Sequence, residues 1–546
     1  MGLLLLNRFM SMQRGRHRRP TQGSNGLVTS VAIKKDVAIK KDSSPSLYDD
    51  SARSHKKSRY SGPSLPEDIW HHIYSLLPLR DAARVACVSH SFKSYWRCFP
   101  NLSLTSATLN VKAGAYEMSC KNAMYLARKT DHILKNHSSI GVKALKLEIW
   151  NFPFFSTSCD LDRWLHLAVK PGIEKLDLQI YESGAGLCDA TLCRKKSHAA
   201  LCRGKSRAAV YNFPCSLLDG SGKSIQQLHL NYCALRPTAG LGCLRSLTSL
   251  ELHLVRITGD ELRCLLSCSV ALEKLTLRSC DELIFLEIPS LPQRLSHLVV
   301  SNCINLEAIK IKAPKLYSFD YSGALIPLSL GDSLQKLYID ALLGPQDVVH
   351  YPWADLLRMV PHLEDLEIAS YCPRDTLVVP GKFLHLRHLC IGAFTPDYDY
   401  LSLVSFLDAC PSLETFTLCV DTDVVRQESV FGESSHDLRQ MPGHMHRNIK
   451  DVLIIGFCSA KSMVELACHM LENAKSLEYL TLNTSSDHEI LCSNSENGRC
   501  RPMSKGMRME AHKALFAVER YILGKVPSTV KLEVVKPCSR CNTLEI

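Results

Sequence analysis

The 546-residue sequence has no run of about twenty apolar residues, the length that a membrane-spanning helix needs. Four leucines follow Gly2, but this run is too short for a secretory signal core, and the basic stretch from Arg14 to Arg19 follows it instead of preceding it. Leu6 stands where N-myristoylation favours a hydroxyl residue. We therefore expect a soluble protein of the nucleus, the cytoplasm or both, with no membrane partner.

Complete signatures of catalysis or metal binding are also lacking. Val31 to Lys34 match a kinase strand motif, but no glycine-rich loop precedes them and no kinase catalytic motif follows. Gly220 to Ser224 resemble the end of a phosphate-binding loop, yet Leu217 replaces its first glycine. Cys538 and Cys541 have the spacing of half a zinc site without a second pair. We therefore expect no catalytic residue, no metal ligand and no cofactor.

The excess of positive over negative charge lies in two segments. The formal net charge is +11, of which residues 1–60 contribute +9 and residues 192–209 contribute +6, so the remainder is slightly acidic. Neither segment has a sustained apolar period, which favours a solvated leader and loop, with a nuclear-import signal as the alternative. Nucleic acid is not expected as a partner. The 24 cysteines follow no disulfide framework, so we expect reduced thiols.

Helical patterning begins at Ser64, which is placed as an N-cap with Glu67 as its capping-box partner. Apolar residues then recur at helical spacing at Ile69, Ile73, Leu76 and Leu77, before Pro78. Two further helices are predicted over 79–85 and 89–96. Three short helices bury little surface alone, so we expect them to pack against a partner or the next domain.

These residues resemble an F-box over 61–104, through Leu65 to Ile69, Leu76 to Arg84 and Trp96. The segment Ser89 to Phe92 departs from the Arg-Arg-Trp of many members but keeps an aromatic residue. The resemblance implies docking on a Skp adaptor and, through it, on the cullin of a ubiquitin ligase. The adaptor-binding residues that it implies are Leu65, Pro66, Ile69, Ile73, Leu76, Leu77, Pro78, Val88, Phe92 and Trp96.

A second pattern, apolar-x-apolar, recurs from about residue 143. Its first positions are Leu145, Leu176, Leu228, Leu250, Leu275, Leu298, Leu337, Leu366, Leu389, Phe416 and Leu480. Most separations lie between about 20 and 30 residues, the period of leucine-rich repeats, each of which supplies one short strand and a return segment. The predicted fold is therefore α/β, with an N-terminal three-helix F-box followed by a leucine-rich-repeat solenoid that has a curved parallel β-sheet.

Side chains alternate along each predicted strand, so Leu228 and Leu230 should enter the core while Gln227, His229 and Asn231 face outward. The outward positions form the candidate surface for an unknown protein target. The candidates are His229, Asn231, Glu251, His253, Arg278, Tyr338, Asp340 and Glu367. Cys233, Cys280 and Cys303 each end a repeat motif and are expected to be buried.

The last hundred residues, through 446–457, 471–482 and 520–527, resemble the FBD region that closes many plant F-box proteins with leucine-rich repeats. The predicted domains are a disordered leader (1–60), the F-box (61–104), a helical linker (105–142), the repeats (143–440, with a loop insertion at 182–223) and an FBD-like cap (441–546). The predicted function is substrate recognition within a Skp-cullin-F-box ubiquitin ligase. A repeat scaffold outside any ligase and a small-molecule receptor remain as alternatives.

Overall fold

The computed structural model describes residues 66–87, 90–113, 118–138, 141–152, 158–182, 210–237, 244–324, 326–341, 359–370, 381–392, 398–422, 425, 428–432, 437–485 and 503–538. The chain divides into two compact units, Met1–His72 and Ile73–Ile546. The described part of the first unit is the start of one helix, α2 (Glu67–Ser75). The second unit contains the remaining elements.

Two helices follow α2, namely α3 (Leu79–Ala86) and α4 (His90–Arg97), which confirms the predicted helices. Tyr74 is buried beside them: its hydroxyl donates to the carbonyl of Ala82, and its ring meets the edge of the Phe99 ring at 6.1 Å. Phe99 belongs to the same apolar core as Leu102 in the first strand of the sheet. The helices from Ile73 onward therefore share one core with the repeats.

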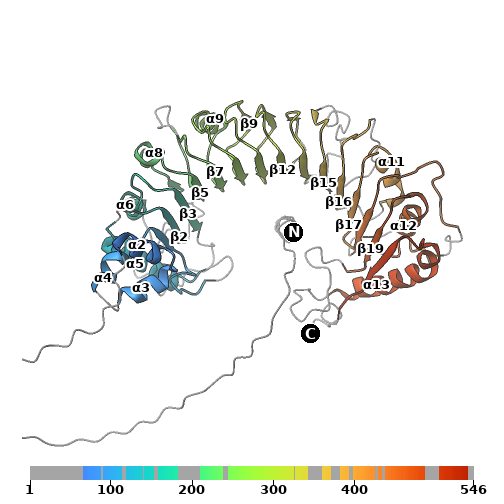
Figure 1. Cartoon of the computed structure of the whole chain (residues 1–546), viewed down its shortest axis with the longest axis horizontal. Coiled ribbons are helices and arrows are strands. Elements are labelled where there is room, and N and C mark those ends of the chain that lie inside the picture. The colour runs from blue at the N-terminus through green and yellow to red at the C-terminus, as the bar shows by residue number, and fades with distance from the viewer. Residues whose placement is uncertain are drawn as a thin grey trace, which may run out of the picture. The chain divides into compact units, whose positions relative to one another are not determined.

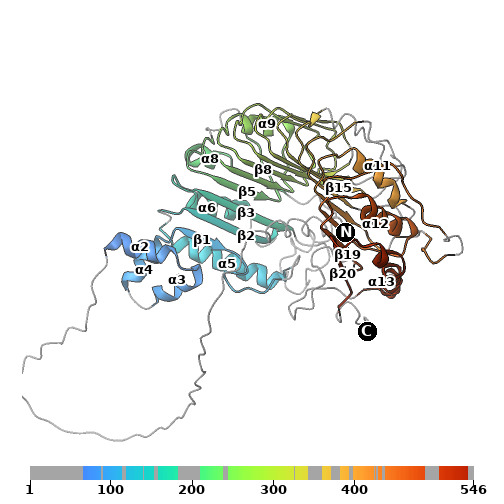
Figure 2. The same ribbon diagram turned by 45° about the vertical axis from the view of Figure 1, so that its right-hand side comes forward.

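The second unit is built on a parallel sheet of fifteen strands within the described residues. Figure 1 shows these strands side by side along the inner side of an arc, and Figure 2 shows the same sheet obliquely. In spatial order they are β1 (Asn101–Leu104), β2 (Ala144–Phe152), β3 (Lys175–Glu182), β5 (Gln227–Asn231), β7 (Ser249–His253), β8 (Lys274–Arg278), β10 (His297–Ser301), β12 (Ser318–Gly323), β14 (Lys336–Ala341), β15 (Asp365–Ser370), β16 (His388–Gly392), β17 (Thr415–Cys419), β18 (Asp451–Ile455), β19 (Tyr479–Asn483) and β20 (Lys531–Val535).

Leucine ladders hold these strands in register. Leu228 lies opposite Leu176 on one side and Leu250 on the other, and all three side chains are buried. Burying one leucine side chain stabilises the fold by about 2 kcal/mol, so a ladder repeated over many strands supplies a continuous core. A shift by one residue would turn each ladder toward solvent, which is why the pattern fixes the register.

Four consecutive strands end in the same backbone turn. Tyr232, Leu254, Ser279 and Asn302 directly follow β5, β7, β8 and β10, and each has a positive φ between 51° and 56°. Each N–H donates to the last carbonyl of the next strand in the sheet at 2.7–2.9 Å, except that Asn302 reaches the carbonyl of Ser322 within β12. After three of these turns the chain enters the core at the buried residues Cys233, Cys280 and Cys303, as predicted.

Return segments form the outer side of the arc (Figure 1). The helices are α5 (Cys120–Asn136), α6 (Ser158–Ala168), α8 (Ser216–Ser221), α9 (Gly259–Ser267), α11 (Leu403–Asp408), α12 (Lys461–Asn473) and α13 (Lys505–Ala517), with 3-10 or π turns η1 (Tyr400–Ser402), η2 (Val518–Ile522) and η3 (Leu523–Lys525). Two small sheets join them, one of β9 (Phe285–Ile288), β11 (Ala308–Ile311) and β13 (Leu328–Ser329), the other of β4 (Tyr211–Asn212) and β6 (Cys233–Ala234). The solenoid therefore has a back layer that mixes helices, short strands and irregular segments.

Two boundaries differ from those expected. The sheet begins at β1, within the predicted F-box segment, because Leu102 and Leu104 pair with Leu145 and Leu147 of β2. Part of the predicted loop insertion is regular, since β4 and α8 lie within 210–223 and Leu218 of α8 is buried. The residues of the insertion from 183 to 209 lie outside the described part of the chain.

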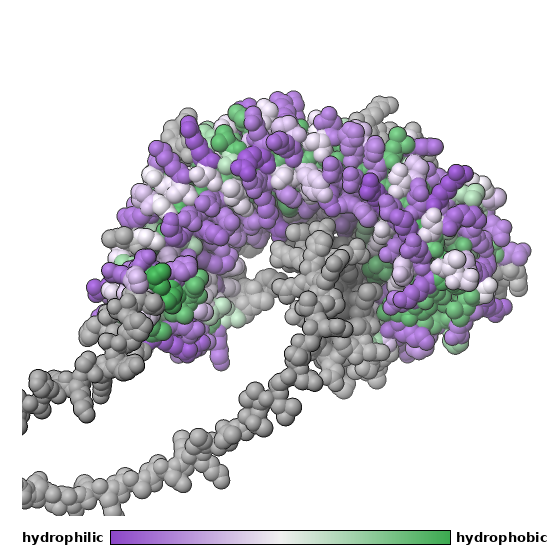
Figure 3. Space-filling view, viewed as in Figure 1, coloured by the Kyte–Doolittle hydropathy of each residue, from purple (hydrophilic) through white to green (hydrophobic). Residues whose placement is uncertain are grey.

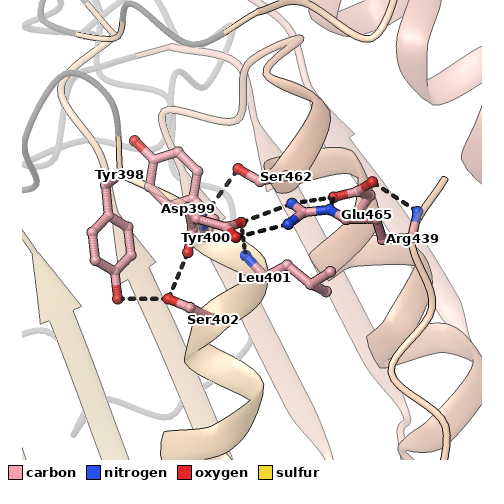
Figure 4. A network of polar contacts seen from close by, with 8 residues as sticks. All are labelled: Tyr398, Asp399, Tyr400, Leu401, Ser402, Arg439, Ser462 and Glu465. Carbon is pink, nitrogen blue, oxygen red and sulfur yellow. Dashed lines mark hydrogen bonds and ion pairs between the residues drawn. The ribbon is translucent and has the colours of Figure 1, made fainter. Parts of the chain in front are cut away.

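A polar network joins the back layer near the C-terminal end (Figure 4). The guanidinium of Arg439 contacts Oε2 of Glu465 on α12 at 2.6 Å and Oδ2 of Asp399 at 2.8 Å. The backbone N–H of Arg439 donates to Oε1 of Glu465 at 2.8 Å, and the Glu465 side chain is fully buried. Ser462, also on α12, accepts from the backbone N–H of Tyr400 at 3.1 Å. These bonds fix η1 and the segment before β18 against α12.

Candidate recognition surfaces

The first candidate surface is the end of α2 and the turn that follows it. The exposed fractions of Ile73 and Leu76 are 39% and 71%, unusually high for aliphatic residues beside a well-packed core. Pro78 is exposed as well. Figure 3 shows hydrophobic residues gathered over this helical end of the unit. Such residues are available to a partner without disturbing the core.

The other predicted adaptor-binding residues fall into three groups. Pro66 and Ile69, which belong to the first unit, are exposed. Leu77, Phe92 and Trp96 are half-buried and pack against the core of the second unit. Leu65 and Val88 lie outside the described residues. Sequence reasoning missed Tyr74, whose position one residue after Ile73 turns it away from the exposed stripe and into the core.

The second candidate surface is the inner face of the sheet. Over its first strands the charges pair across neighbouring strands: Lys146 contacts Asp177 at 2.8 Å and His229 contacts Asp177 at 3.0 Å. Two strands further on, Lys274 contacts Glu251 at 2.8 Å. Burial alone would raise the pKa of Asp177 and of Glu251, but the neighbouring cations outweigh it and lower both pKa values. We call Lys146, Asp177, His229, Glu251 and Lys274 the paired strip.

A cavity of about 340 Å³ lies against the paired strip, between β1 and β7. Its walls include Ser103, Lys146, Asp177, His229 and Glu251. This volume lies within the range of small-ligand sites, which is about 300–1,000 Å³. The charged groups on the walls already contact one another or Lys274, so none of those carboxylates lacks a counter-charge.

Further along the inner face, the charges are arranged differently. Asp320 of β12 lies opposite Tyr338 of β14, and Tyr338 lies opposite Glu367 of β15. Asp340 lies two residues beyond Tyr338, on the same face of β14. We call Asp320, Tyr338, Asp340 and Glu367 the acidic row. Hydroxyls are the polar partners of two of its carboxylates: Ser318 donates to Asp320 at 3.3 Å and Ser322 to Asp340 at 3.1 Å.

The pKa values of this row move in the opposite direction from those of the paired strip. Burial raises the pKa of Asp320 and of Asp340. For Glu367, burial and the neighbouring acidic groups Cys419, Asp320 and Asp340 raise the pKa to about 8. Burial destabilises the ionised form of these carboxyl groups. For Asp320 it outweighs the opposite effect of the cations His297, Arg278 and Lys274.

Two target-binding candidates are more buried than expected. Asn231 is 6% exposed and Asp340 is 4% exposed, so the expectation of solvent-facing side chains is wrong at these two positions. Both lie at or near the end of a strand, where neighbouring strand ends cover them, and the Asn231 amide donates to the carbonyl of Ile180 at 3.0 Å. The remaining candidates are half-buried on the inner face: His229, Glu251, His253, Arg278, Tyr338 and Glu367.

Sequence reasoning also missed Lys146, Asp177 and Asp320. Lys146 and Asp177 occupy the middle of predicted strands, and alternation alone could have found them. Asp320 lies in the segment 304–323, where a compressed repeat spacing indicates one or two irregular repeats but no leucine pair marks the strand. Among the described residues, no three His, Cys, Asp or Glu side chains come together as metal ligands. No described helix is long and apolar enough to cross a membrane.

Comparison with known proteins assigns both parts of the chain. Residues 63–104 match the F-box domain, and residues 133–539 match the leucine-rich-repeat domain of the At1g61320/AtMIF1 family. The repeat match covers well over half of the chain. This chain belongs to the plant F-box proteins with leucine-rich repeats. F-box proteins are in general non-catalytic adaptors, so substrate recognition is the general role of this F-box/LRR protein.

The relatives of the F-box/LRR protein carry corresponding names. F-box/FBD/LRR-repeat protein At3g26920 of Arabidopsis thaliana is 23% identical, over 77% of this chain and 88% of the relative. FBD-associated F-box protein At1g66310 of the same plant is 22% identical over the same shares. Among solved structures, a leucine-rich-repeat protein of Leptospira interrogans covers 79% of this chain and 95% of its own, with 13% identity and a TM-score of 0.26.

Proposed function

We propose that this F-box/LRR protein is the substrate-recognition subunit of a Skp-cullin-F-box ubiquitin ligase. Its N-terminal helices would bind the Skp adaptor and the inner face of its sheet would bind a target protein. It would perform no chemistry itself. Tethering would raise the effective concentration of target lysines near a ubiquitin-charged enzyme, which accelerates transfer without a catalytic group on this chain.

The observation that carries the proposal is the exposure of Leu76 and Ile73. Neighbouring apolar residues such as Tyr74 and Leu79 are almost fully buried, so the local sequence can bury side chains where the fold requires it. Exposed aliphatic residues gathered at one end of a protein are typical of a protein-protein contact. The resemblance to F-box proteins implies adaptor contact at Leu76 and Ile73, which supports the proposal.

The test is co-purification of the full chain with a Skp adaptor. We expect Leu76→Asp to reduce adaptor recovery by about tenfold or more, because a charge would be buried at the contact. Ile304→Asp is the matched control, since Ile304 is 74% exposed in a turn before β11 and Leu76 is 71% exposed. It should leave recovery within about twofold of wild type.

Thermal unfolding of both variants separates binding from folding. An adaptor recovery that stays at the wild-type level in Leu76→Asp would contradict the proposal. So would an equal loss in the two variants, because the contact would then depend on general exposed hydrophobicity and not on this end of the chain.

A further inference from the structure

We propose that the acidic row is the part of the inner face that holds the target, and that its ligand is an extended, basic segment of the target chain. Two lysine or arginine side chains of that segment would lie on either side of Tyr338, one on Asp320 and the other on Glu367. This inference rests on the proposed function, because it names the chemistry of the target that the repeats recognise.

The lack of ion pairs at contact distance among the described residues distinguishes the row from the rest of this face. Asp177, Glu251 and Asp365 each contact a lysine of an adjacent strand, namely Lys146, Lys274 and Lys336. Among the described residues, no ion pair reaches the three carboxylates of the row, although they occupy consecutive strands of the sheet. The sheet therefore carries acidic groups here that no described cation contacts directly.

An unpartnered polar atom forms a second observation. Oε1 of Glu367 is inaccessible to solvent and has no hydrogen-bond partner among the described residues. Buried polar groups normally find partners, so unpartnered ones on a binding face indicate a place for a ligand.

The chemistry of the row fits a cation. A lysine or arginine head on each outer carboxylate gains a charge-assisted contact, and the Tyr338 ring between them offers a cation-π contact. The cations Lys274, Arg278 and His297 lie on the β8 and β10 side, where they act on Asp320. They repel a basic ligand on that side, which directs the segment across β12, β14 and β15.

Strand spacing sets the spacing of the basic residues. Asp320 and Glu367 are two strands apart, and adjacent strands lie about 4.8 Å apart, so their backbones are separated by roughly 10 Å. A segment in the polyproline II conformation advances about 3.1 Å per residue and makes one turn in three residues, so its residues i and i+3 point the same way and lie about 9 Å apart. The preferred ligand therefore carries lysine or arginine at positions i and i+3.

The experiment measures the affinity of the full chain, purified with its adaptor, for labelled peptides by fluorescence anisotropy at low ionic strength. The probes are Gly-Ser peptides with two arginines at i and i+3, the same arginines at i and i+1, and two glutamates at i and i+3. We expect the first peptide to bind tightest, and Glu367→Gln and Asp320→Asn each to weaken it by about tenfold. Glu533→Gln is the matched control, because Glu533 occupies the same position on β20 but is exposed.

Three outcomes would overturn the inference. The first is equal binding of the arginine and glutamate peptides, and the second is an equal loss of affinity in Glu533→Gln and Glu367→Gln. The third concerns the chain's own basic residues at 192–209. If replacing their six arginines and lysines by glutamine raises the peptide affinity more than about tenfold, this chain and not the target supplies the ligand. Adaptor recovery in the same preparations reports separately on the proposed function.

Discussion

Glu465 in the back layer and Glu367 on the inner face are two shielded carboxyl groups with opposite surroundings. Glu465 lies on α12 and is held by the guanidinium and the backbone N–H of Arg439. Within the described part of the chain, Glu367 contacts no cation, and its Oε1 has no hydrogen-bond partner. Both cost free energy to desolvate, but only Glu465 recovers that cost within the folded chain. A shielded charge with partners stabilises the architecture, whereas one without partners indicates a site for a ligand.

Arg439→Ala would make Glu465 resemble Glu367. The substitution leaves a fully buried carboxylate without a counter-charge, so we expect the free energy of unfolding to fall by about 3–5 kcal/mol. Urea denaturation at neutral pH measures the change. In the Arg439→Ala background, Glu465→Gln should restore part of the stability because it removes the uncompensated charge. A loss of less than about 1 kcal/mol in Arg439→Ala would show that the two carboxyl groups do not differ in this way.

The Glu367→Gln variant tests the difference between Glu465 and Glu367 through the pH dependence of the free energy of unfolding. The pKa of Glu367 rises from 4.5 to about 8 on folding, so the folded chain binds the extra proton between these values. The stability associated with this group is complete below pH 4.5 and is lost as the pH rises toward 8. At its steepest the loss is about 1.4 kcal/mol per pH unit. The glutamine variant should therefore gain stability over wild type as the pH rises, measured by urea denaturation across that range.

The control for the pH experiment is Glu251→Gln. Salt contacts with Lys274 help to lower the pKa of Glu251, so its stabilising effect is present above the unfolded-state pKa and is lost in acid. The two glutamine variants should therefore differ from wild type at opposite ends of the pH range. If they changed the profile in the same direction, the distinction between the acidic row and the paired strip would be lost.

Asp177→Asn and Asp320→Asn give the smallest expected effect. Asp177 contacts Lys146 and His229, so its neutralisation should lower the free energy of unfolding by about 1 kcal/mol at pH 7. Asp320 has no such contact and a raised pKa, so its neutralisation should cost nothing or stabilise slightly. Thermal unfolding of both variants at pH 7 measures the difference. A larger loss of stability in Asp320→Asn than in Asp177→Asn would contradict the conclusion that the carboxylates of the acidic row have no stabilising ion pair.

Leucine alternation predicted most of the sheet because it reports directly on which face is buried. The pairs Leu228 and Leu230 or Leu275 and Leu277 lie in strands, as expected. Other strands use different apolar residues, such as Phe319 with Tyr321 in β12 and Val452 with Ile454 in β18. The first pair lies in the segment 304–323, where irregular repeats were expected without a located strand, and the second lies in a segment assigned to the FBD region. β1 was also missed, because α5 separates it from β2 and breaks the spacing.

The charges of the inner face were harder to predict, because each depends on a neighbour that lies far along the chain. Alternation placed His229 on the inner face, but its partner Asp177 is separated from it by an insertion. Asn231 fits the outward pattern equally well, yet it lies at a strand end where a carbonyl of β3 accepts its amide. Whether a polar residue is paired, buried or without a partner depends on the register between strands. That register cannot be read from the residues around it in the sequence.

The four left-handed turns after β5, β7, β8 and β10 have a consequence for how the chain can change length. They stand 22, 25 and 23 residues apart, and each begins with an N–H that bonds to the following strand. A segment running from one turn to the next therefore has the same backbone conformation and the same inter-strand hydrogen bond at both ends. Loss or duplication of one such segment would preserve the turns and their hydrogen bonds on both sides. The distance between the helical end and the acidic row could therefore change by whole repeats, to suit a target of a different size.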